Sequence, residues 1–89
     1  MLEHGGRVGH IISICVDPDS WGRGIGSMLL ERIEELFRDR NTCKSILEVR
    51  VSNRRAIDFY EKRGYRIDGV IRGYYLDNED AYIMSKKLC

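Results

Sequence analysis

The sequence lacks an apolar run long enough to cross a membrane, and it lacks an excess of charge of either sign. Its longest apolar-rich run, IISICV, spans only residues 11–16, whereas a membrane-spanning helix needs about 20 apolar residues. The 15 Lys and Arg residues are interspersed with 14 Asp and Glu residues, so no basic stripe favours nucleic acid and no acidic block indicates a disordered tail. The start, MLEHGGRVGH, is too polar for a signal peptide. We therefore expect neither a membrane nor a nucleic acid as a partner.

Cysteine and metal-ligand patterns are also scarce. The three cysteines, Cys15, Cys43 and Cys89, are odd in number, far apart and free of any C-x-x-C motif. This spacing predicts no disulfide framework and no zinc site, and it favours a reducing, cytoplasmic setting. His4 and His10 lack metal-ligand spacing, so no metal is expected, and His10 is interpreted as a polar residue at a strand edge rather than as a second base. With 89 residues, the chain suffices for one small domain over residues 1–89.

The spacing of apolar residues predicts a small α/β (α+β) domain. Strands are expected at residues 9–16, 46–51, 65–70 and 81–88, and helices at residues 27–40 and 54–63. A further strand-forming stretch at 71–76 is expected to precede the turn DNED. The segment NTCKS, residues 41–45, is interpreted as a break, and Glu34 is expected on the charged face of its helix, four residues before Arg38. The resulting element order is β-α-β-α-β-β around a mixed sheet.

The predicted order brings two segments to one edge of this sheet. Within strand 46–51, Leu47, Val49 and Val51 share one face, while Glu48 and Arg50 point to the other. The first two strands and the helix between them form a β-α-β unit, which predicts a parallel pair joined by a right-handed crossover. Ligands of open α/β sheets bind at the carboxyl ends of the strands. We therefore expect the glycine-rich segment after the first strand and the Ser-Asn pair after the second to lie at the same edge.

The stretch SWGRGIGSMLLERI, residues 20–33, places three glycines against the start of the first helix. Glycine is a poor helix former, so its use here indicates that a ligand comes very close to the backbone. The N–H groups of a helix's first turn favour a phosphate. The Rossmann pattern G-x-G-x-x-G does not fit, because counting from Gly22 puts Ser27 at the third glycine position, and the Walker pattern is absent.

The segment VDPDSWGRGIGSMLL resembles the pyrophosphate-binding motif of the GNAT superfamily of acetyl-CoA-dependent N-acetyltransferases. Gly24 and Gly26 occupy the small-residue positions of the motif Arg/Gln-x-x-Gly-x-Gly/Ala, and Trp21 stands where Arg or Gln is usual. Residues 47–65, LEVRVSNRRAIDFYEKRGY, and the later stretch IRGYYLDNEDAYIMSKKL are similar to the branch that acetylates protein N-termini, above all the ribosomal-protein type. The resemblance, from Val8 to Leu88, covers the C-terminal half of the family fold. The missing N-terminal half is consistent with a truncated reading frame, a fragment or a natural half-domain.

The resemblance implies acetyl-CoA as co-substrate and a set of residues that hold it. Backbone groups of the first strand would bind the pantetheine, the glycine segment would cradle the pyrophosphate, and an asparagine would hydrogen-bond the pantetheine arm. These residues are Ile14, Cys15, Val16, Gly22, Arg23, Gly24, Ile25, Gly26, Ser27 and Asn53. The alternatives are a plain core strand, a glycine turn without a ligand and a helix N-cap. A covalent acetyl-cysteine at Cys15 is not expected, because a small apolar core residue fits that position better.

The resemblance also implies catalytic residues and a substrate groove. Glu48 aligns with the general base that takes the proton of an α-ammonium, and Tyr60 aligns with the tyrosine that protonates the leaving thiolate. The alternatives are a solvated carboxylate paired with Arg50 or a neighbouring strand, and a tyrosine packed on the sheet. Tyr74 and Tyr75 lie where the family's strand loop borders the peptide groove, or are simply sheet aromatics.

The function implied by the resemblance is acetyl transfer from acetyl-CoA to a protein N-terminal α-amine by direct attack. One alternative keeps the cofactor and changes the acceptor to a small amine or a lysine. Another is a noncatalytic half-domain that binds CoA or only pairs with another chain. Because the first strand would lie at an open sheet edge, we expect self-association or a partner chain that covers this edge.

Overall fold

The computed structural model describes residues 7–11 and 24–89. In these ranges the elements are β1 (Arg7–Ile11), α1 (Ile25–Asp39), β2 (Thr42–Arg50), α2 (Arg54–Lys62), β3 (Arg66–Ile71) and β4 (Ala81–Lys87). This order confirms the predicted β-α-β-α-β-β succession and the α/β (α+β) class. The expected cofactor residues Ile14, Cys15, Val16, Gly22 and Arg23 lie outside the described residues, so their roles stay predictions.

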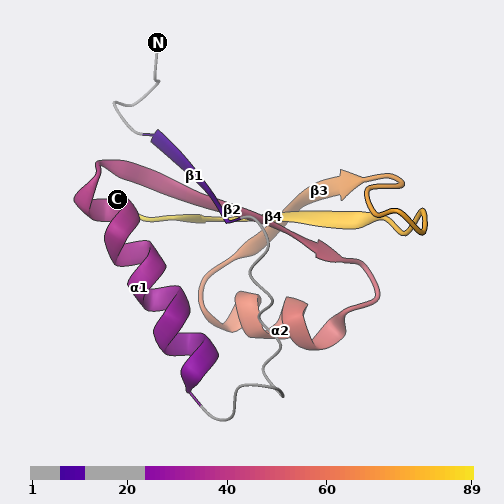
Figure 1. Ribbon diagram of the computed structural model, residues 1–89, viewed down its shortest axis with the longest axis horizontal. Helices are drawn as coiled ribbons and strands as arrows, with labels where there is room; N and C mark the ends of the chain where they lie inside the picture. Colours follow the sequence, from indigo (N-terminus) through magenta and orange to yellow (C-terminus); the bar gives the residue numbers. More distant parts are fainter. Residues whose placement is uncertain (1–6, 12–23) are drawn as a thin grey trace.

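The described strands form one mixed sheet in the order β1-β2-β4-β3. β1 is parallel to β2, as predicted, and β4 is antiparallel to both β2 and β3. Figure 1 shows α1 and α2 on the same side of this sheet, below it in the view, and the loop between β3 and β4 at the far right. Among the described strands, β1 and β3 are therefore the edges of the sheet.

The side of the sheet that faces the helices contains the apolar core. Leu47 of β2 pairs with Met84 of β4, and these side chains are 1% and 0% exposed. Cross-strand partners share a face of the sheet, and here they meet Leu30 of α1 and Ile57 of α2 in one buried cluster. Burial of each such side chain contributes about 1.5–3 kcal/mol. We call this side of the sheet the helix face.

A polar cluster is buried within the helix face. Glu34 of α1 is 4% exposed and accepts hydrogen bonds from the Tyr65 hydroxyl at 3.0 Å and from the Lys86 ammonium at 2.9 Å. The Ser45 hydroxyl lies 2.8 Å from the Tyr65 oxygen and donates to it, because the single phenol proton goes to Glu34. Burial raises the pKa of Tyr65, so its phenol stays protonated. The expected place of Glu34 on the charged face before Arg38 is wrong, because partners distant in the sequence bind it.

β2 begins at Thr42 rather than at Ile46, where the sequence predicts it. The predicted break at residues 41–45 is therefore wrong for all but Asn41, which adopts a positive φ of 59°. Thr42 and Ser45 are 7% and 0% exposed. Short polar residues favour turns when they face water, but the Ser45 hydroxyl has a partner 20 residues away in Tyr65. A local pattern cannot show such a partner.

The segment 71–76, predicted to form a strand, is mostly a loop. Ile71 ends β3, and residues 72–80 connect β3 to β4. Gly73 and Asn78 adopt left-handed backbone with φ of 61° and 69°, which a continuous strand excludes. The Asp80 carboxylate accepts from the Gly73 N–H at 2.9 Å. Aspartate side chains thus satisfy backbone donors that a sheet would otherwise pair.

Cys43 and Cys89 form a disulfide, which corrects the expectation of none. The antiparallel pairing of β2 with β4 brings the chain end opposite the start of β2, where the Leu88 N–H donates to the Cys43 carbonyl at 2.7 Å. The two Cα atoms are then 4.9 Å apart, which is within disulfide range. Spacing along the sequence misses this contact, because the sheet brings together residues 46 positions apart. The disulfide removes the argument from the cysteine pattern for a cytoplasmic setting, and that setting stays a prediction.

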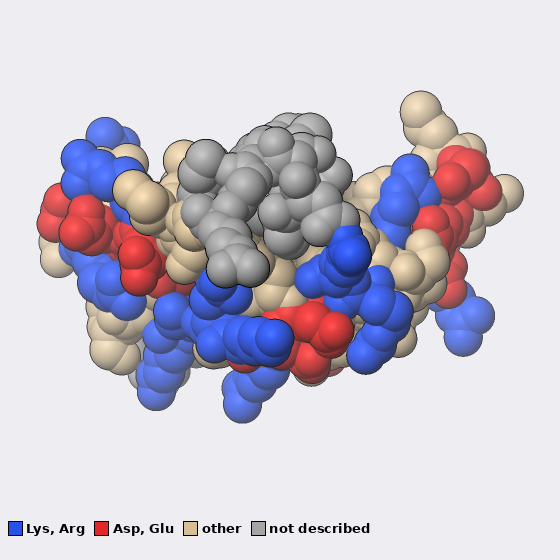
Figure 2. All heavy atoms as spheres, turned by 90° about the horizontal axis from the view of Figure 1, so that it is seen from below, with Lys and Arg blue, Asp and Glu red and all other residues tan. Residues whose placement is uncertain are grey.

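The surface on the helix side carries both signs of charge. Figure 2 shows this side, on which Lys and Arg side chains are interspersed with Asp and Glu. Within residues 7–11 and 24–89, no helix is long and apolar enough to cross a membrane. In the same ranges, no three His, Cys, Asp or Glu side chains gather as metal ligands would.

Candidate functional site

A histidine and a glutamate form a close pair on the side of the sheet opposite the helices. His10 of β1 is the register partner of Ile46, so Glu48, two residues further along β2, lies on the same face. The His10 Nε2 atom lies 2.7 Å from both Glu48 carboxylate oxygens. The Glu48 side chain is only 9% exposed, whereas His10 is 40% exposed. We call the side that carries His10, Glu48 and Arg50 the Glu48 face.

The pairing of His10 with Glu48 was missed by the sequence reasoning. His10 does lie on an edge strand, as expected, but it contacts the predicted base directly. The alternative partner for Glu48 was Arg50 or a neighbouring strand, and the partner is indeed on a neighbouring strand. The parallel β1–β2 register was the missing information, since alternation alone cannot say which polar residues of two strands become neighbours.

Tyr74, from the loop after β3, reaches the same carboxylate. Its hydroxyl donates to the Glu48 Oε1 atom at 3.3 Å, and its side chain remains 46% exposed. Its ring meets that of Tyr75 edge-on, with centroids 5.0 Å apart. Desolvation, and then the Glu48 charge, raise the pKa of Tyr74, so its phenol stays a donor. The structure thus brings Tyr74 to the predicted base and places Tyr75 against Tyr74, although neither tyrosine belongs to a strand.

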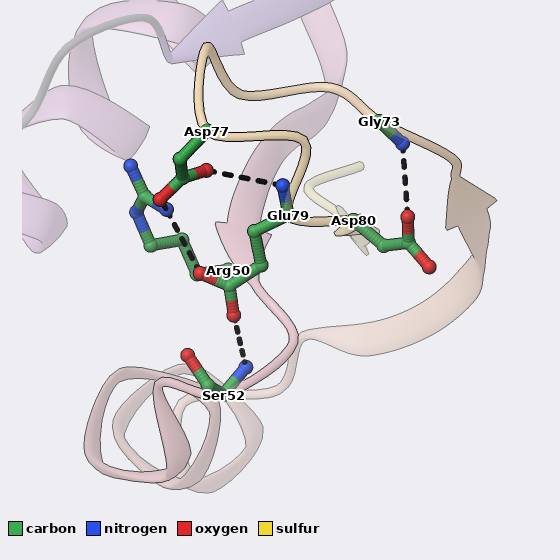
Figure 3. A network of polar contacts seen from close by, with 6 residues as sticks. All are labelled: Arg50, Ser52, Gly73, Asp77, Glu79 and Asp80. Carbon is green, nitrogen blue, oxygen red and sulfur yellow. Dashed lines mark hydrogen bonds and ion pairs between the residues drawn. The ribbon is translucent and has the colours of Figure 1, made fainter.

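The loop that carries the tyrosines is attached to β2 by Arg50, as Figure 3 shows. The Arg50 Nη1 atom lies 2.8 Å from a carboxylate oxygen of Asp77 and 2.8 Å from one of Glu79. The other Glu79 oxygen accepts from the Ser52 N–H at 3.1 Å. Bonds to Ser52 and then Arg50 lower the pKa of Glu79, and the Glu79 N–H and then Arg50 lower that of Asp77. The Arg50 guanidinium also lies 4.1 Å from the centre of the Tyr75 ring.

Tyr60 of α2, the predicted acid, lies on the helix face and is 5% exposed. It packs edge-on against Phe59 and Tyr65, with centroids 5.4 Å and 5.6 Å away. Burial, and then the electrostatic effect of Tyr75, raise the pKa of Tyr60 to about 12. Within the described residues, its hydroxyl makes no hydrogen bond. The structure therefore shows a protonated phenol that packs among aromatic rings, as the alternative of a core aromatic requires.

The start of α1 presents the donors that a phosphate would use. Gly24 is the N-cap, with φ of 81°, and the helix begins at Ile25, two residues earlier than predicted. The N–H groups of Ile25, Gly26 and Ser27 belong to the first turn of α1. N–H groups in the first turn of a helix have no carbonyl partner within that helix. The Arg63 Nε atom donates to the Ser27 hydroxyl at 3.2 Å, which brings a positive charge from the end of α2 to this turn.

Asn53 caps α2, which is the alternative left open for it. Its side-chain oxygen accepts from the Ala56 N–H at 3.1 Å. The cap uses only the oxygen, so the side-chain NH₂ group keeps its two donors. Because Asn53 follows the carboxyl end of β2, those donors lie at the sheet edge where the sequence places the ligand. A cap and a cofactor contact are compatible in this residue.

Comparison with known proteins assigns the family. Residues 1–65 match the acetyltransferase (GNAT) family. The chain therefore belongs to the GNAT family.

Three similar proteins illustrate how much of the family fold the chain represents. It is 43% identical to an N-alpha-acetyltransferase of Saccharolobus solfataricus, over 92% of this chain and 50% of the relative. It is 41% identical to the ribosomal protein bS18-alanine N-acetyltransferase of Salmonella typhimurium, over 84% of this chain and 53% of that protein. The structure of Arabidopsis thaliana Naa50 in complex with the bisubstrate analogue CoA-Ac-MVNAL matches with a TM-score of 0.79 and 34% identity, over 96% of this chain and 58% of that one. The chain spans about half the length of the curated relatives it matches.

Proposed function

We propose that this chain carries the cofactor-binding and catalytic half of an acetyl-CoA-dependent N-acetyltransferase that acts on protein N-terminal α-amines. The observation that carries the proposal is the nearly buried Glu48 carboxylate, bonded to His10 and Tyr74 on the Glu48 face. The names of two relatives support N-terminal amines as acceptors. The ligand of Naa50, which joins CoA to a peptide, supports a shared site for both substrates.

The proposed base is the Glu48 carboxylate together with His10. An α-ammonium group has a pKa near 8, and its nitrogen attacks only after it loses a proton. Glu48 accepts that proton directly or through a water, and the adjacent His10 imidazole holds the carboxylate in place and shares the charge. Low exposure of Glu48 strengthens its interaction with a cationic amine.

The residue proposed to assist departure of the sulfur is Tyr60. Acetyl-CoA supplies a thioester whose sulfur leaves as a thiolate. A phenol with a pKa near 12 stays protonated at neutral pH and donates a hydrogen bond to the developing negative charge. Because a thiol has a pKa near 8.5, complete proton transfer from this phenol is unfavourable. Stabilisation of the thiolate by the Tyr60 hydroxyl, with a final proton from water, fits this pKa better than full protonation.

The proposed cofactor cradle is the first turn of α1 with the glycine segment before it. The N–H groups of Ile25, Gly26 and Ser27 and the Arg63 guanidinium supply donors and positive charge for a pyrophosphate. The NH₂ group of Asn53 would donate to the pantetheine arm, and the backbone of residues 14–16 would pair with that arm.

The test compares two acceptors and two glutamate variants. We expect the chain to acetylate a short peptide with a free N-terminus, but not the same peptide blocked at its N-terminus and carrying a lysine. Glu48→Gln should lower kcat by about 10²–10⁴-fold, mainly at pH values below 8, where the amine is charged. Glu35→Gln is the control, because Glu35 is exposed and, among residues 7–11 and 24–89, bonds only to Arg32. Mass spectrometry of the peptides measures each rate.

Three results would contradict parts of the proposal. Transfer to the blocked lysine peptide alone would move the acceptor class to lysines. Binding of CoA in calorimetry without transfer to either peptide would favour a noncatalytic half-domain. An unchanged pH–rate profile in Glu48→Gln would remove Glu48 from the mechanism.

A further inference from the structure

The loop at residues 72–80 has little apolar packing to hold it. Tyr74 is 46% exposed, and Leu76 at the loop tip is fully exposed. The loop nevertheless has a defined shape, because its polar groups bind one another. The Glu79 N–H donates to Asp77 at 3.0 Å, and the Tyr75 N–H donates to the Glu79 carbonyl at 3.2 Å. These bonds set the internal shape of the loop but do not fix its position relative to the sheet.

Arg50 of β2 fixes the position of the loop relative to the sheet. Its guanidinium lies between the carboxylates of Asp77 and Glu79 and over the ring of Tyr75. The Glu79 carboxylate also accepts a hydrogen bond from the Ser52 N–H, just after the end of β2. The guanidinium of arginine presents several donors in a fixed plane, so one side chain can serve two carboxylates and a ring at once. In Figure 3 these contacts converge on Arg50 from the loop that carries both acids.

The place of Arg50 on the strand links this contact to the reaction centre. Glu48 and Arg50 are two residues apart on β2 and therefore point to the same face. The loop fixed by Arg50 puts the Tyr74 hydroxyl 3.3 Å from the Glu48 carboxylate. The Cα atoms of Glu48 and Arg50 are thus one strand repeat apart, about 7 Å along β2. A shift of the loop at Arg50 would move Tyr74 and Tyr75 relative to the base.

We propose that Arg50 is a positioning residue for the acceptor: by fixing the loop through Asp77, Glu79 and Tyr75, it sets the wall against which the first residue of the acceptor peptide binds beside Glu48. This inference rests on the proposed function, because it assigns the acceptor to that site. Arg50 itself touches neither the amine nor the cofactor. Its effect reaches the substrate only through the two tyrosines.

The kinetic test separates peptide binding from cofactor binding. Arg50→Gln should raise KM for a free N-terminal peptide about tenfold, the size expected when one coupled network of contacts is lost. KM for acetyl-CoA should stay within about twofold of the parent, since the cofactor residues lie elsewhere. Arg50→Lys should recover part of the effect, because a lysine keeps the charge but cannot serve both carboxylates and the ring. Arg32→Gln is the matched control, an arginine with an equally short 2.8 Å ion pair on the exposed side of α1.

Hydrogen exchange gives a readout that does not depend on activity. The Ser52 and Glu79 N–H groups bond to carboxylates that Arg50 holds. Both should exchange about tenfold faster in Arg50→Gln and at the parental rate in Arg32→Gln. Unchanged exchange, or faster exchange with an unchanged peptide KM, would overturn the positioning role. A parent chain that transfers no acetyl group to the peptide would instead refute the proposed function, which is a different observation.

Discussion

The two faces of the sheet contain the same chemical group in two different settings. On the helix face, Glu34 accepts from a tyrosine, Tyr65, and a cation, Lys86. On the Glu48 face, Glu48 accepts from the tyrosine Tyr74 and from His10. Both glutamate side chains are nearly buried, at 5% and 9% exposure.

The difference between the two clusters lies in the partners. Tyr65 is 3% exposed and Tyr74 is 46% exposed, and the Lys86 side chain is 24% exposed whereas His10 is 40% exposed. A cluster whose partners are largely buried has little contact with solvent and mainly stabilises the fold. A cluster with exposed partners, here His10 and Tyr74, is open to solvent and accessible to a substrate. The two glutamates therefore differ in the burial of their partners and not in the burial of the carboxylate itself.

The largest expected effect is on the free energy of unfolding, and it is tested by removing each of the two glutamates in turn. Glu34→Ala removes the buried acceptor of both the Tyr65 hydroxyl and the partly buried Lys86 ammonium, so we expect a loss of about 3 kcal/mol. Glu48→Ala should cost less than about 1 kcal/mol, because His10 and Tyr74 can turn to water. Urea unfolding measures both. Glu35→Ala on the same helix is the control, with an expected change within about 0.5 kcal/mol. Equal losses for Glu34→Ala and Glu48→Ala would show that the Glu48 face is part of the stabilising core.

The local elements were predictable where neighbouring residues decide them. The alternation in β2 separates Glu48 and Arg50 from Leu47 and Val49, and the structure confirms this division. Helix α2 ends at Lys62, before the positive φ of Gly64, close to where the sequence predicts. In each case the determining interaction lies within a few residues of the chain.

The rest depends on contacts between distant residues. The His10–Glu48 pair follows from the register of two parallel strands, and the Cys43–Cys89 disulfide follows from an antiparallel pairing at the chain end. Residues 71–76 resembled a strand because Ile and Tyr favour strands, but the loop at 72–80 takes its shape from carboxylate bonds and from Arg50. No periodic pattern encodes the His10–Glu48 pair, the disulfide or the Arg50 ion pairs, because each joins residues at least 27 positions apart.

A smaller effect on the free energy of unfolding is expected when the tyrosine of each cluster loses its hydroxyl. Tyr65→Phe removes a hydroxyl that bonds Glu34 and Ser45 in the core, so we expect a loss of about 2 kcal/mol as both groups lose a partner. Tyr74→Phe removes a hydroxyl of an exposed side chain, and the change should stay within about 0.5 kcal/mol. The same urea unfolding series compares the two changes. Losses of the same size would contradict the division between a closed and an accessible tyrosine.

The smallest effect is a pH dependence confined to the Glu48 face. Hydrogen bonds lower the pKa of Asp77, through the Glu79 N–H and Arg50, and that of Glu79, through Ser52 and Arg50. A carboxylate whose folded pKa is lowered contributes stability above its unfolded pKa, 3.8 for Asp and 4.5 for Glu, and this contribution is lost as pH falls through the folded value. Protection of the Ser52 amide from hydrogen exchange should therefore hold at pH 5 and decline only at pH values below about 4.

The matched measurement is the same pH series in Arg50→Gln. Without the guanidinium, the two carboxylates lose part of the interaction that lowers their pKa values. Ser52 protection should then be weaker at pH 5 and should begin to decline at a higher pH than in the parent. If the parent and the variant lose protection over the same pH range, the ion pairs with Arg50 do not hold the loop, and the attachment of the two tyrosines to the Glu48 face must come from other contacts.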